Sequence, residues 1–177
     1  MGCAIYRLVK LTHTNTNDAV GTIPRLKDVG PDPALISDAL LGIIAQRLVR
    51  RVCPHCAKPY TPTSEELRKL GLKATPENTQ HWLKGKGCIK CFNSGYLGRE
   101  AIVELLDVND RVRELIYQGT MTELNRYLKT IDFTSFSIAA AEKVTTGITT
   151  MEEVFRVLPH SALYYIIKIG NSKSRVC

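Results

Sequence analysis

The sequence predicts a mixed α/β fold with a metal-binding motif near its middle and a mainly helical C-terminal part. Two Cys-x-x-Cys pairs form the motif, and a succession of helical patterns follows residue 108. The composition is that of a folded protein: 44% of the 177 residues are hydrophobic and 23% are charged, which fits neither a disordered chain nor a coiled coil. No run of 18 apolar residues occurs, so a conventional transmembrane helix is not expected.

The N-terminal part is predicted to begin with a strand and a short helix. The strand is expected over residues 4–11. The helix is expected over residues 20–29, where apolar residues recur at helical spacing and Gly30 follows as a typical helix-ending residue. Pro24 places the start of its regular part close to that residue, with Thr22 as the cap.

A longer amphipathic helix is expected to begin at Ser37 and to reach Arg51. Its apolar residues recur at a spacing that suits one helix face. They are Leu40, Leu41, Ile43, Ile44, Leu48 and Val49. Basic residues at 47, 50 and 51 suit the negative end of the helix dipole, which supports the same interpretation.

The middle of the chain is predicted to contain a short helix, a loop and a strand. Residues 63–66 read Thr-Ser-Glu-Glu, which is a capping box ahead of a helix that runs through Leu70 and Gly71. Residues 74–87 are polar and rich in glycine and lysine, and are expected to form a loop. Residues 95–107 look like a turn that leads into a strand.

After residue 108 the pattern is helical. Two apolar stripes consist of Val112, Leu115 and Ile116, and of Leu124, Tyr127 and Leu128. A third helical segment covers residues 138–144 and ends at Gly147. A second capping box, at residues 150–153, opens a last helix that Pro159 stops. Residues 161–177 show no clear relation to this pattern.

The cysteines indicate metal chemistry. The N-terminus lacks the apolar segment of a signal peptide, so a cytoplasmic protein with reduced thiols is expected. Four of the six cysteines form the pairs Cys53/Cys56 and Cys88/Cys91. Each pair can supply two thiolates to a tetrahedral Zn²⁺, and four protein ligands leave no open position, which predicts a structural site. The 31 residues between the pairs would form a hairpin-like insertion, and nearby basic side chains at 51, 58, 86 and 90 would offset the charge.

Other interpretations of these residues remain open. Cys53-Pro54-His55-Cys56 is also the active-site pattern of oxidising thiol-disulfide exchange proteins, although these place the first cysteine at a helix N-terminus. The net charge of +7, the arginines at 47–51 and the lysines at 84 and 86 would suit a zinc-ribbon module that binds nucleic acid or protein. A loop histidine such as His13 has no assigned role on its own.

Several segments, in the same order along the chain, resemble the type II secretion and type IV pilus assembly ATPases. They are AQRLVRRVCPHC at residues 45–56, GCIKC at 87–91, GYLGR at 95–99, AIVELL at 101–106 and GITTMEEV at 147–154. The resemblance covers about Thr12 to Leu158. It implies a RecA-like P-loop ATPase domain that is followed by a zinc-bearing C-terminal subdomain.

The resemblance also implies a function. Members of this family are cytoplasmic hexamers, peripheral at the inner membrane, that use ATP and Mg²⁺ to drive assembly of pilins or pseudopilins through inner-membrane partners. By this resemblance His13 matches the family's His box near the terminal phosphate of the nucleotide, and Arg47 matches an arginine expected near the nucleotide. The zinc ligands would be Cys53, Cys56, Cys88 and Cys91, and no nucleic acid is expected as a partner.

The sequence departs from the family in one respect that bears on activity. No Gly-x-x-x-x-Gly-Lys-Ser/Thr motif occurs, so the loop that cradles the phosphates is missing and ATP hydrolysis by this chain alone is not expected. The chain is therefore interpreted as the C-terminal part of a truncated assembly ATPase. Its expected sections are a RecA-like remnant (1–51), a zinc subdomain (52–107), a helical subdomain (108–158) and an atypical tail (159–177).

Overall fold

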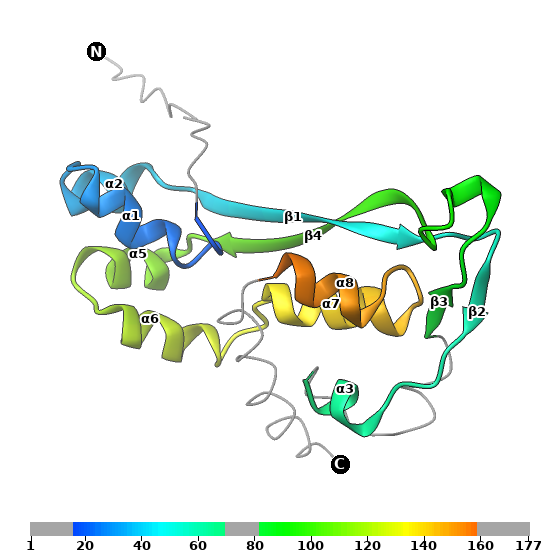
Figure 1. Ribbon diagram of the computed structural model, residues 1–177. Coiled ribbons are helices and arrows are strands. Elements are labelled where there is room, and N and C mark those ends of the chain that lie inside the picture. Colours follow the sequence, from blue (N-terminus) through cyan, green and yellow to red (C-terminus); the bar gives the residue numbers. More distant parts are fainter. Residues whose placement is uncertain (1–15, 70–81, 159–177) are drawn as a thin grey trace. The chain divides into compact units, whose positions relative to one another are not determined.

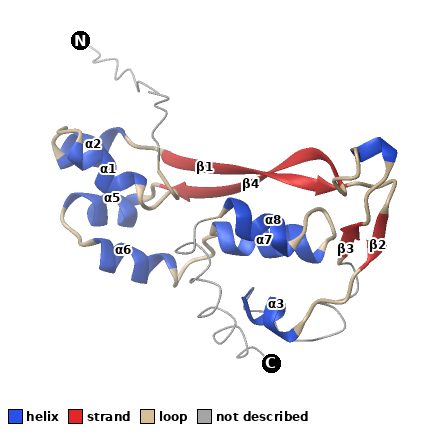
Figure 2. Ribbon diagram, viewed as in Figure 1, coloured by secondary structure: helices blue, strands red, loops and turns tan. Residues whose placement is uncertain are grey.

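The structure, a computed structural model, describes residues 16–69 and 82–158 (Figure 1). The strand predicted at residues 4–11 and the tail lie outside these residues. The described chain forms two compact units. Unit 1 comprises the residues up to 45 together with 105–133, and unit 2 comprises residues 46–104 together with those from 134 on. Within each unit helices and strands are mixed, as the sequence predicts (Figure 2).

The described residues contain seven α-helices, one short 3₁₀-helix and four strands. The α-helices are α1 (Thr22–Asp28), α2 (Pro33–Ala39), α3 (Ser64–Lys69), α5 (Asp110–Tyr117), α6 (Met121–Leu128), α7 (Phe136–Thr145) and α8 (Met151–Val157). The 3₁₀-helix spans Ile89–Cys91. The strands are β1 (Gly42–Val52), β2 (Ala57–Pro59), β3 (Leu83–Gly85) and β4 (Tyr96–Asp107).

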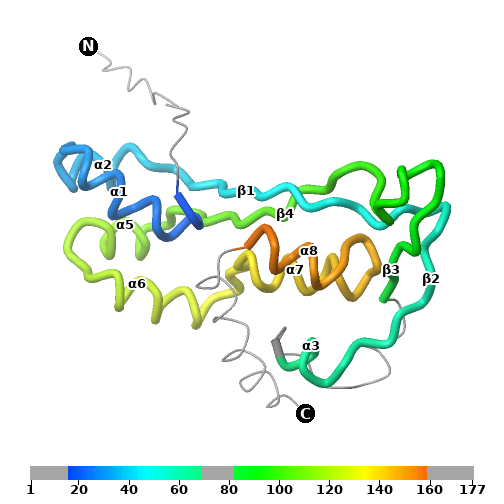
Figure 3. Tube along the Cα trace, viewed as in Figure 1, coloured from blue at the N-terminus to red at the C-terminus, as the bar shows by residue number. Residues whose placement is uncertain are grey.

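The two long strands pair with one another although they are far apart in the sequence. β1 and β4 form a two-stranded sheet, and their traces run side by side in opposite directions (Figures 1 and 3). The Val108 N–H donates to the Leu41 carbonyl, 3.1 Å away, just beyond the ends of the strands in unit 1. A second, short sheet pairs β2 with β3 in antiparallel register, with Lys58 opposite Lys84.

The long helix predicted from Ser37 to Arg51 is wrong. The helix begins earlier, because Asp32 caps it by accepting from the Ala34 N–H at 2.7 Å and Pro33 occupies the first turn. It ends at Ala39, and the rest of the predicted helix is β1. Ile43 and Val49 are buried, whereas Ile44 is 70% exposed, so the apolar residues do not share one face.

Unit 1 has its own hydrophobic core. The predicted apolar stripes of α5 and α6 lie in it, apart from Tyr127, which packs against its edge. The buried members are Ala19, Ile23, Ile36, Ile43, Leu106, Val108, Val112, Leu115, Ile116, Leu124 and Leu128. Arg113 of α5 donates to the carbonyl oxygens of Ser37 and Asp38 at the C-terminal end of α2, where helix carbonyls lack partners within the helix.

Two predicted helix starts in this part of the chain fare differently. The first helix begins at Thr22, close to Pro24 as predicted, but Thr22 is its first residue and not its cap. The Thr22 hydroxyl instead donates to the Asp18 carbonyl at 3.1 Å. In α3 the predicted capping box is confirmed, since Glu66 N–H donates to Thr63 Oγ1 at 3.2 Å and Thr63 N–H donates to Glu66 Oε2 at 2.8 Å.

In unit 2 the strand predicted at 95–107 and the helix predicted at 138–144 are confirmed as β4 and α7. Gly147 follows α7 with φ of +73°, and Ile148 N–H donates back to the Lys143 carbonyl at 2.9 Å, as in a glycine-ended helix. The buried Glu104 of β4 accepts from the Phe136 N–H at 2.9 Å, which places a carboxylate at the N-terminus of α7. Part of the loop predicted at 74–87 is the strand β3, and residues 74–81 lie outside the described residues.

None of the helices in the described part of the chain is long and apolar enough to cross a membrane.

Candidate metal centre

The first cysteine pair follows directly after β1. Val52, the last residue of the strand, donates its N–H to the Ile148 carbonyl at 2.9 Å, and Cys53 donates its N–H to the Gly95 carbonyl at 2.9 Å. The Cys56 N–H then donates to the Cys53 carbonyl at 3.3 Å, which closes a tight turn. Backbone hydrogen bonds therefore hold both Cys53 and Cys56 in position, independently of their side chains.

The second pair lies at the 3₁₀-helix, with Cys88 as the residue before it and Cys91 as its last residue. The N–H groups of Cys91 and Asn93 donate to the Cys88 carbonyl at 3.1 and 2.9 Å, so the chain curls around that oxygen. Phe92 and Asn93 both have left-handed backbone conformations, with φ of +50° and +59°. The Ser94 hydroxyl donates to the Cys91 carbonyl at 2.6 Å. These hydrogen bonds make the turn after Cys91 compact.

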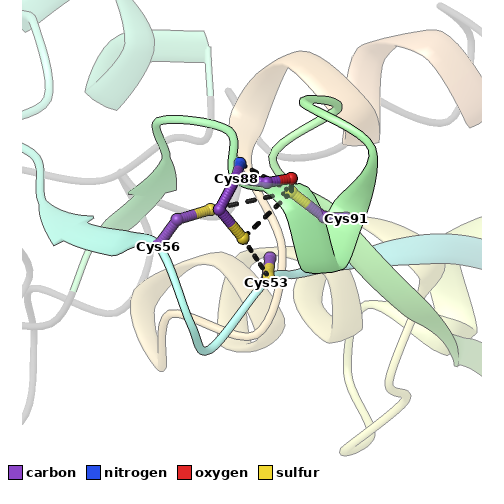
Figure 4. A group of neighbouring side chains, drawn as sticks. All are labelled: Cys53, Cys56, Cys88 and Cys91. Atoms are coloured by element: carbon purple, nitrogen blue, oxygen red, sulfur yellow. Dashed lines mark hydrogen bonds between the residues drawn. The ribbon is translucent and has the colours of Figure 1, made fainter.

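The four cysteine side chains converge on one point (Figure 4). Their Sγ atoms all lie within 4.8 Å of one another. The Sγ–Sγ distances are 3.9 Å for Cys53 and Cys88, 3.8 Å for Cys56 and Cys91, and 3.7 Å for Cys88 and Cys91. A Zn–S distance of about 2.3 Å in a tetrahedron places sulfur atoms about 3.8 Å apart. The spacing of the sulfurs therefore fits Zn²⁺.

The electrostatics of the cluster favour a bound cation. Burial raises the pKa of the Cys56 thiol to about 12. Burial also opposes ionisation of Cys91, but hydrogen bonds from the backbone N–H groups of Cys88 and Gly95 lower its pKa to about 6. The Cys88 N–H lies 3.2 Å from Cys91 Sγ. Buried thiolates need a positive partner, and a metal ion with four thiolate ligands supplies it.

The β2–β3 hairpin supports the centre from outside. The Lys86 N–H donates to the Cys56 carbonyl at 3.1 Å, which attaches the end of the hairpin to the first cysteine pair. Gly85 and Gly95 cross so closely that a Cβ on Gly95 would lie 2.7 Å from the Gly85 carbonyl oxygen. The hairpin corresponds to the predicted insertion between the pairs. The side chains of Lys58, Lys86 and Lys90 are exposed around it.

An ion network around a buried carboxylate, Glu153, was not predicted from the sequence. Glu153 is completely buried and accepts from Arg50 and from Arg156, with shortest distances of 2.6 and 2.5 Å. Burial alone would raise the pKa of Glu153, but the hydrogen bonds from Arg156 and Arg50 lower it to about 2. Arg50 also lies over the Tyr96 ring, 4.1 Å from its centre.

This network corrects the predicted capping box at residues 150–153. The Glu153 N–H does donate to Thr150 Oγ1, at 3.2 Å, and Thr150 caps α8. The Glu153 carboxylate does not accept a hydrogen bond from the Thr150 N–H, as a capping box requires, because it accepts from Arg50 and Arg156 instead. Thr150 also lies 2.7 Å from the Tyr96 hydroxyl, so the start of α8 is joined to β4 near the cysteines.

The two nucleotide-proximal residues implied by the resemblance are placed differently. His13 lies outside the described residues. Arg47 lies on β1, half-buried, in the strand that leads to Cys53. The thiol-disulfide exchange interpretation gains no support, because Cys53 is fully buried and follows a strand rather than opening a helix.

A mixed α/β chain with a buried four-cysteine centre at the end of a long strand is thus the class of protein that the structure defines. The cluster is the only group of three or more potential metal-binding side chains found in the described residues. Comparison with known families identifies the class further. The model of the Type II/IV secretion system protein family matches residues 9–156. The chain belongs to this family.

Individual relatives agree with the family. The chain is 43% identical over 141 residues to the type IV pilus assembly ATPase PilB of Thermus thermophilus, covering 79% of this chain and 16% of the relative. It is 44% identical over 151 residues to the type II secretion system ATPase E of Vibrio cholerae, and 40% identical over 148 residues to the type II secretion system protein E of Pseudomonas aeruginosa. These two matches cover 84% and 83% of this chain and 29% of each relative.

Proposed function

We propose that this chain forms the zinc-bearing part of a type II secretion or type IV pilus assembly ATPase, with one structural Zn²⁺ held by its four paired cysteines. The observation that carries the proposal is the convergence of the four Sγ atoms at tetrahedral spacing within a chain of this family. Zn²⁺ with four protein ligands has no open position for substrate, so its contribution is to the fold.

The residues of the centre connect elements that are remote in the sequence. Cys53 and Cys56 follow directly after β1, while Cys88 and Cys91 lie shortly before β4. Binding of one ion by both pairs would fix the ends of the two long strands, and Glu153 fixes α8 to the same strand through Arg50. The zinc centre would thereby give the ATPase a rigid C-terminal body.

The ATP-dependent function needs residues beyond these. The 177 residues contain no phosphate-binding Gly-x-x-x-x-Gly-Lys-Ser/Thr loop, and phosphoryl transfer depends on such a loop and on Mg²⁺. We therefore propose that His13 and Arg47 act near a nucleotide whose phosphates are bound by a separate segment carrying that loop. The assembly would be a cytoplasmic hexamer, peripheral at the inner membrane, that works with inner-membrane secretion or pilus proteins on pilins or pseudopilins.

Metal content and nucleotide turnover, measured on the same purified sample, test this proposal. We expect one zinc per chain by elemental analysis and no ATP hydrolysis by the chain alone. Addition of a segment that carries the phosphate-binding loop should restore turnover, and His13→Ala should reduce the restored rate. A preparation that folds without zinc would overturn the metal assignment, and turnover by the chain alone would overturn the assignment of the nucleotide residues.

A further inference from the structure

The turn between Cys88 and Cys91 exposes two large apolar side chains. Ile89 is 91% exposed and Phe92 is 92% exposed, the highest values among the exposed large hydrophobic residues of the described chain. We call residues 89–92 the knuckle tip. The tip also contains the buried Cys91, a residue of the metal centre, so its two apolar side chains project into solvent beside that centre.

The fold holds Phe92 in this exposed position. Its φ of +50° is a left-handed conformation that side-chain-bearing residues rarely adopt. The Phe92 N–H nevertheless donates to the Ile89 carbonyl at 3.2 Å, and the Asn93 N–H donates to the Cys88 carbonyl at 2.9 Å, so the turn is hydrogen-bonded. Strained backbone that the surroundings enforce is concentrated at functional positions. An aromatic side chain held in water by such a turn therefore suggests a contact surface.

Basic residues flank the knuckle tip in the sequence. The segments 51–60 and 83–99, which form the two cysteine turns and the β2–β3 hairpin, contain no Asp or Glu. Lys58, Lys86 and Lys90 are exposed, and no ion pair joins them to any other residue in the described ranges. Lys84, which lies opposite Lys58 in the hairpin, is instead paired with Glu152 at 3.5 Å.

We propose that the knuckle tip is a membrane-contact element that inserts Ile89 and Phe92 into the interface of an anionic lipid bilayer. The three lysines would face the lipid headgroups, and each would strengthen binding by about fivefold. An exposed apolar tip with basic neighbours in the sequence suits the headgroup region of a bilayer, where aromatic and aliphatic side chains insert shallowly. The inference deepens the proposed peripheral membrane location and rests on a folded, zinc-bound turn.

Vesicle sedimentation with the full chain in its zinc-loaded form tests the proposal. The probes are vesicles of phosphatidylcholine alone and vesicles that contain about 30% phosphatidylglycerol, a typical anionic surface. We expect binding to the anionic vesicles only. The double variant Ile89→Ser/Phe92→Ser should lower that binding by roughly tenfold or more. Leu35→Ser is the matched control, because Leu35 is an apolar residue 66% exposed on α2 in unit 1, and should bind like the parent chain.

A second variant, Lys86→Glu/Lys90→Glu, tests the charge separately and should abolish binding at low salt. Zinc content is measured for every variant, so loss of the metal centre is distinguished from loss of the lipid contact. The proposal is overturned if the zinc-loaded parent chain ignores anionic vesicles or binds neutral ones equally well. It is also overturned if either variant retains zinc and binds anionic vesicles as the parent chain does. That result would indicate that the knuckle tip contacts an acidic protein partner instead of a bilayer.

Discussion

Arg50 and Glu153 are 103 residues apart in the sequence and are joined by three hydrogen bonds. The Arg50 backbone N–H donates to Oε1 at 3.0 Å, and its Nε and Nη2 donate to Oε2 at 2.9 and 2.6 Å. The carboxylate is completely buried. Because Arg50 is three residues before Cys53, this contact ties α8 to the strand that delivers the first zinc ligand.

Replacing Glu153 should therefore destabilise unit 2. Glu153→Gln removes the charge that two guanidinium groups share, and we expect the free energy of unfolding to fall by roughly 3 kcal/mol. The neighbouring Glu152→Gln is the matched control. Its side chain is 72% exposed and its pairing with Lys84 is loose, at 3.5 Å, so its loss should cost less than about 1 kcal/mol. Urea denaturation of the zinc-loaded variants, followed by circular dichroism, measures the loss of unfolding free energy in each variant. Equal losses would contradict the role given to Glu153.

The same carboxylate should make stability depend on acid pH. The pKa of Glu153 is about 2 in the fold, against an ordinary value of 4.5. Because the folded pKa is the lower one, the stabilisation is fully present above about pH 4.5 and is lost as the pH falls toward 2. The difference in unfolding free energy between the parent chain and Glu153→Gln should thus shrink between about pH 5 and pH 3. A difference that stays constant over this range would show that Glu153 does not ionise as described.

Local sequence patterns predicted the elements whose stabilisation is local. The capping box at Thr63 and Glu66, the apolar stripes of α5 and α6, and the helix end at Gly147 were all predicted from residues within a few positions of one another. The four cysteines belong to the same class, because their spacing already specifies two tight turns. The structure adds only that the two turns meet.

The errors come from long-range contacts. Ile43, Ile44 and Leu48 fit a helical spacing, but pairing with β4, which begins at Tyr96, makes this segment a strand and leaves Ile44 exposed. In a short apolar run, periodicity alone does not distinguish a helix from a strand. Glu153 was assigned to a capping box for the same reason. Nothing within four residues of it indicates that Arg50 would take its carboxylate.

The crossing of Gly85 and Gly95 predicts a steric limit at the metal centre. Gly95 and Gly98 both have positive φ, +75° and +80°, so an alanine at either position should cost about 1 kcal/mol for its backbone conformation. The new Cβ would strike backbone atoms of Gly85 at Gly95, whereas at Gly98 it would meet only the Arg51 Cδ atom, at an ordinary contact distance of 4.0 Å. Gly95→Ala should therefore weaken zinc retention against a chelator, and Gly98→Ala should not. Equal zinc retention would show that the hairpin can move away from the centre.

The last prediction concerns removal of the metal ligands themselves. Cys88→Ser should abolish tight zinc binding, because three thiolates and a hydroxyl no longer match the tetrahedral site, and the binding energy that is lost is folding energy, on the order of 10 kcal/mol. Hydrogen exchange should then show lost protection at the ends of β1 and β4 and in the β2–β3 hairpin, while α5 and α6, which pack in the core of unit 1, keep theirs. A chelator should produce the same pattern in the parent chain. Cys3→Ser, which removes a cysteine outside the two pairs, should change neither zinc content nor exchange. If Cys88→Ser retained one zinc per chain and full protection, the four-cysteine assignment would be wrong.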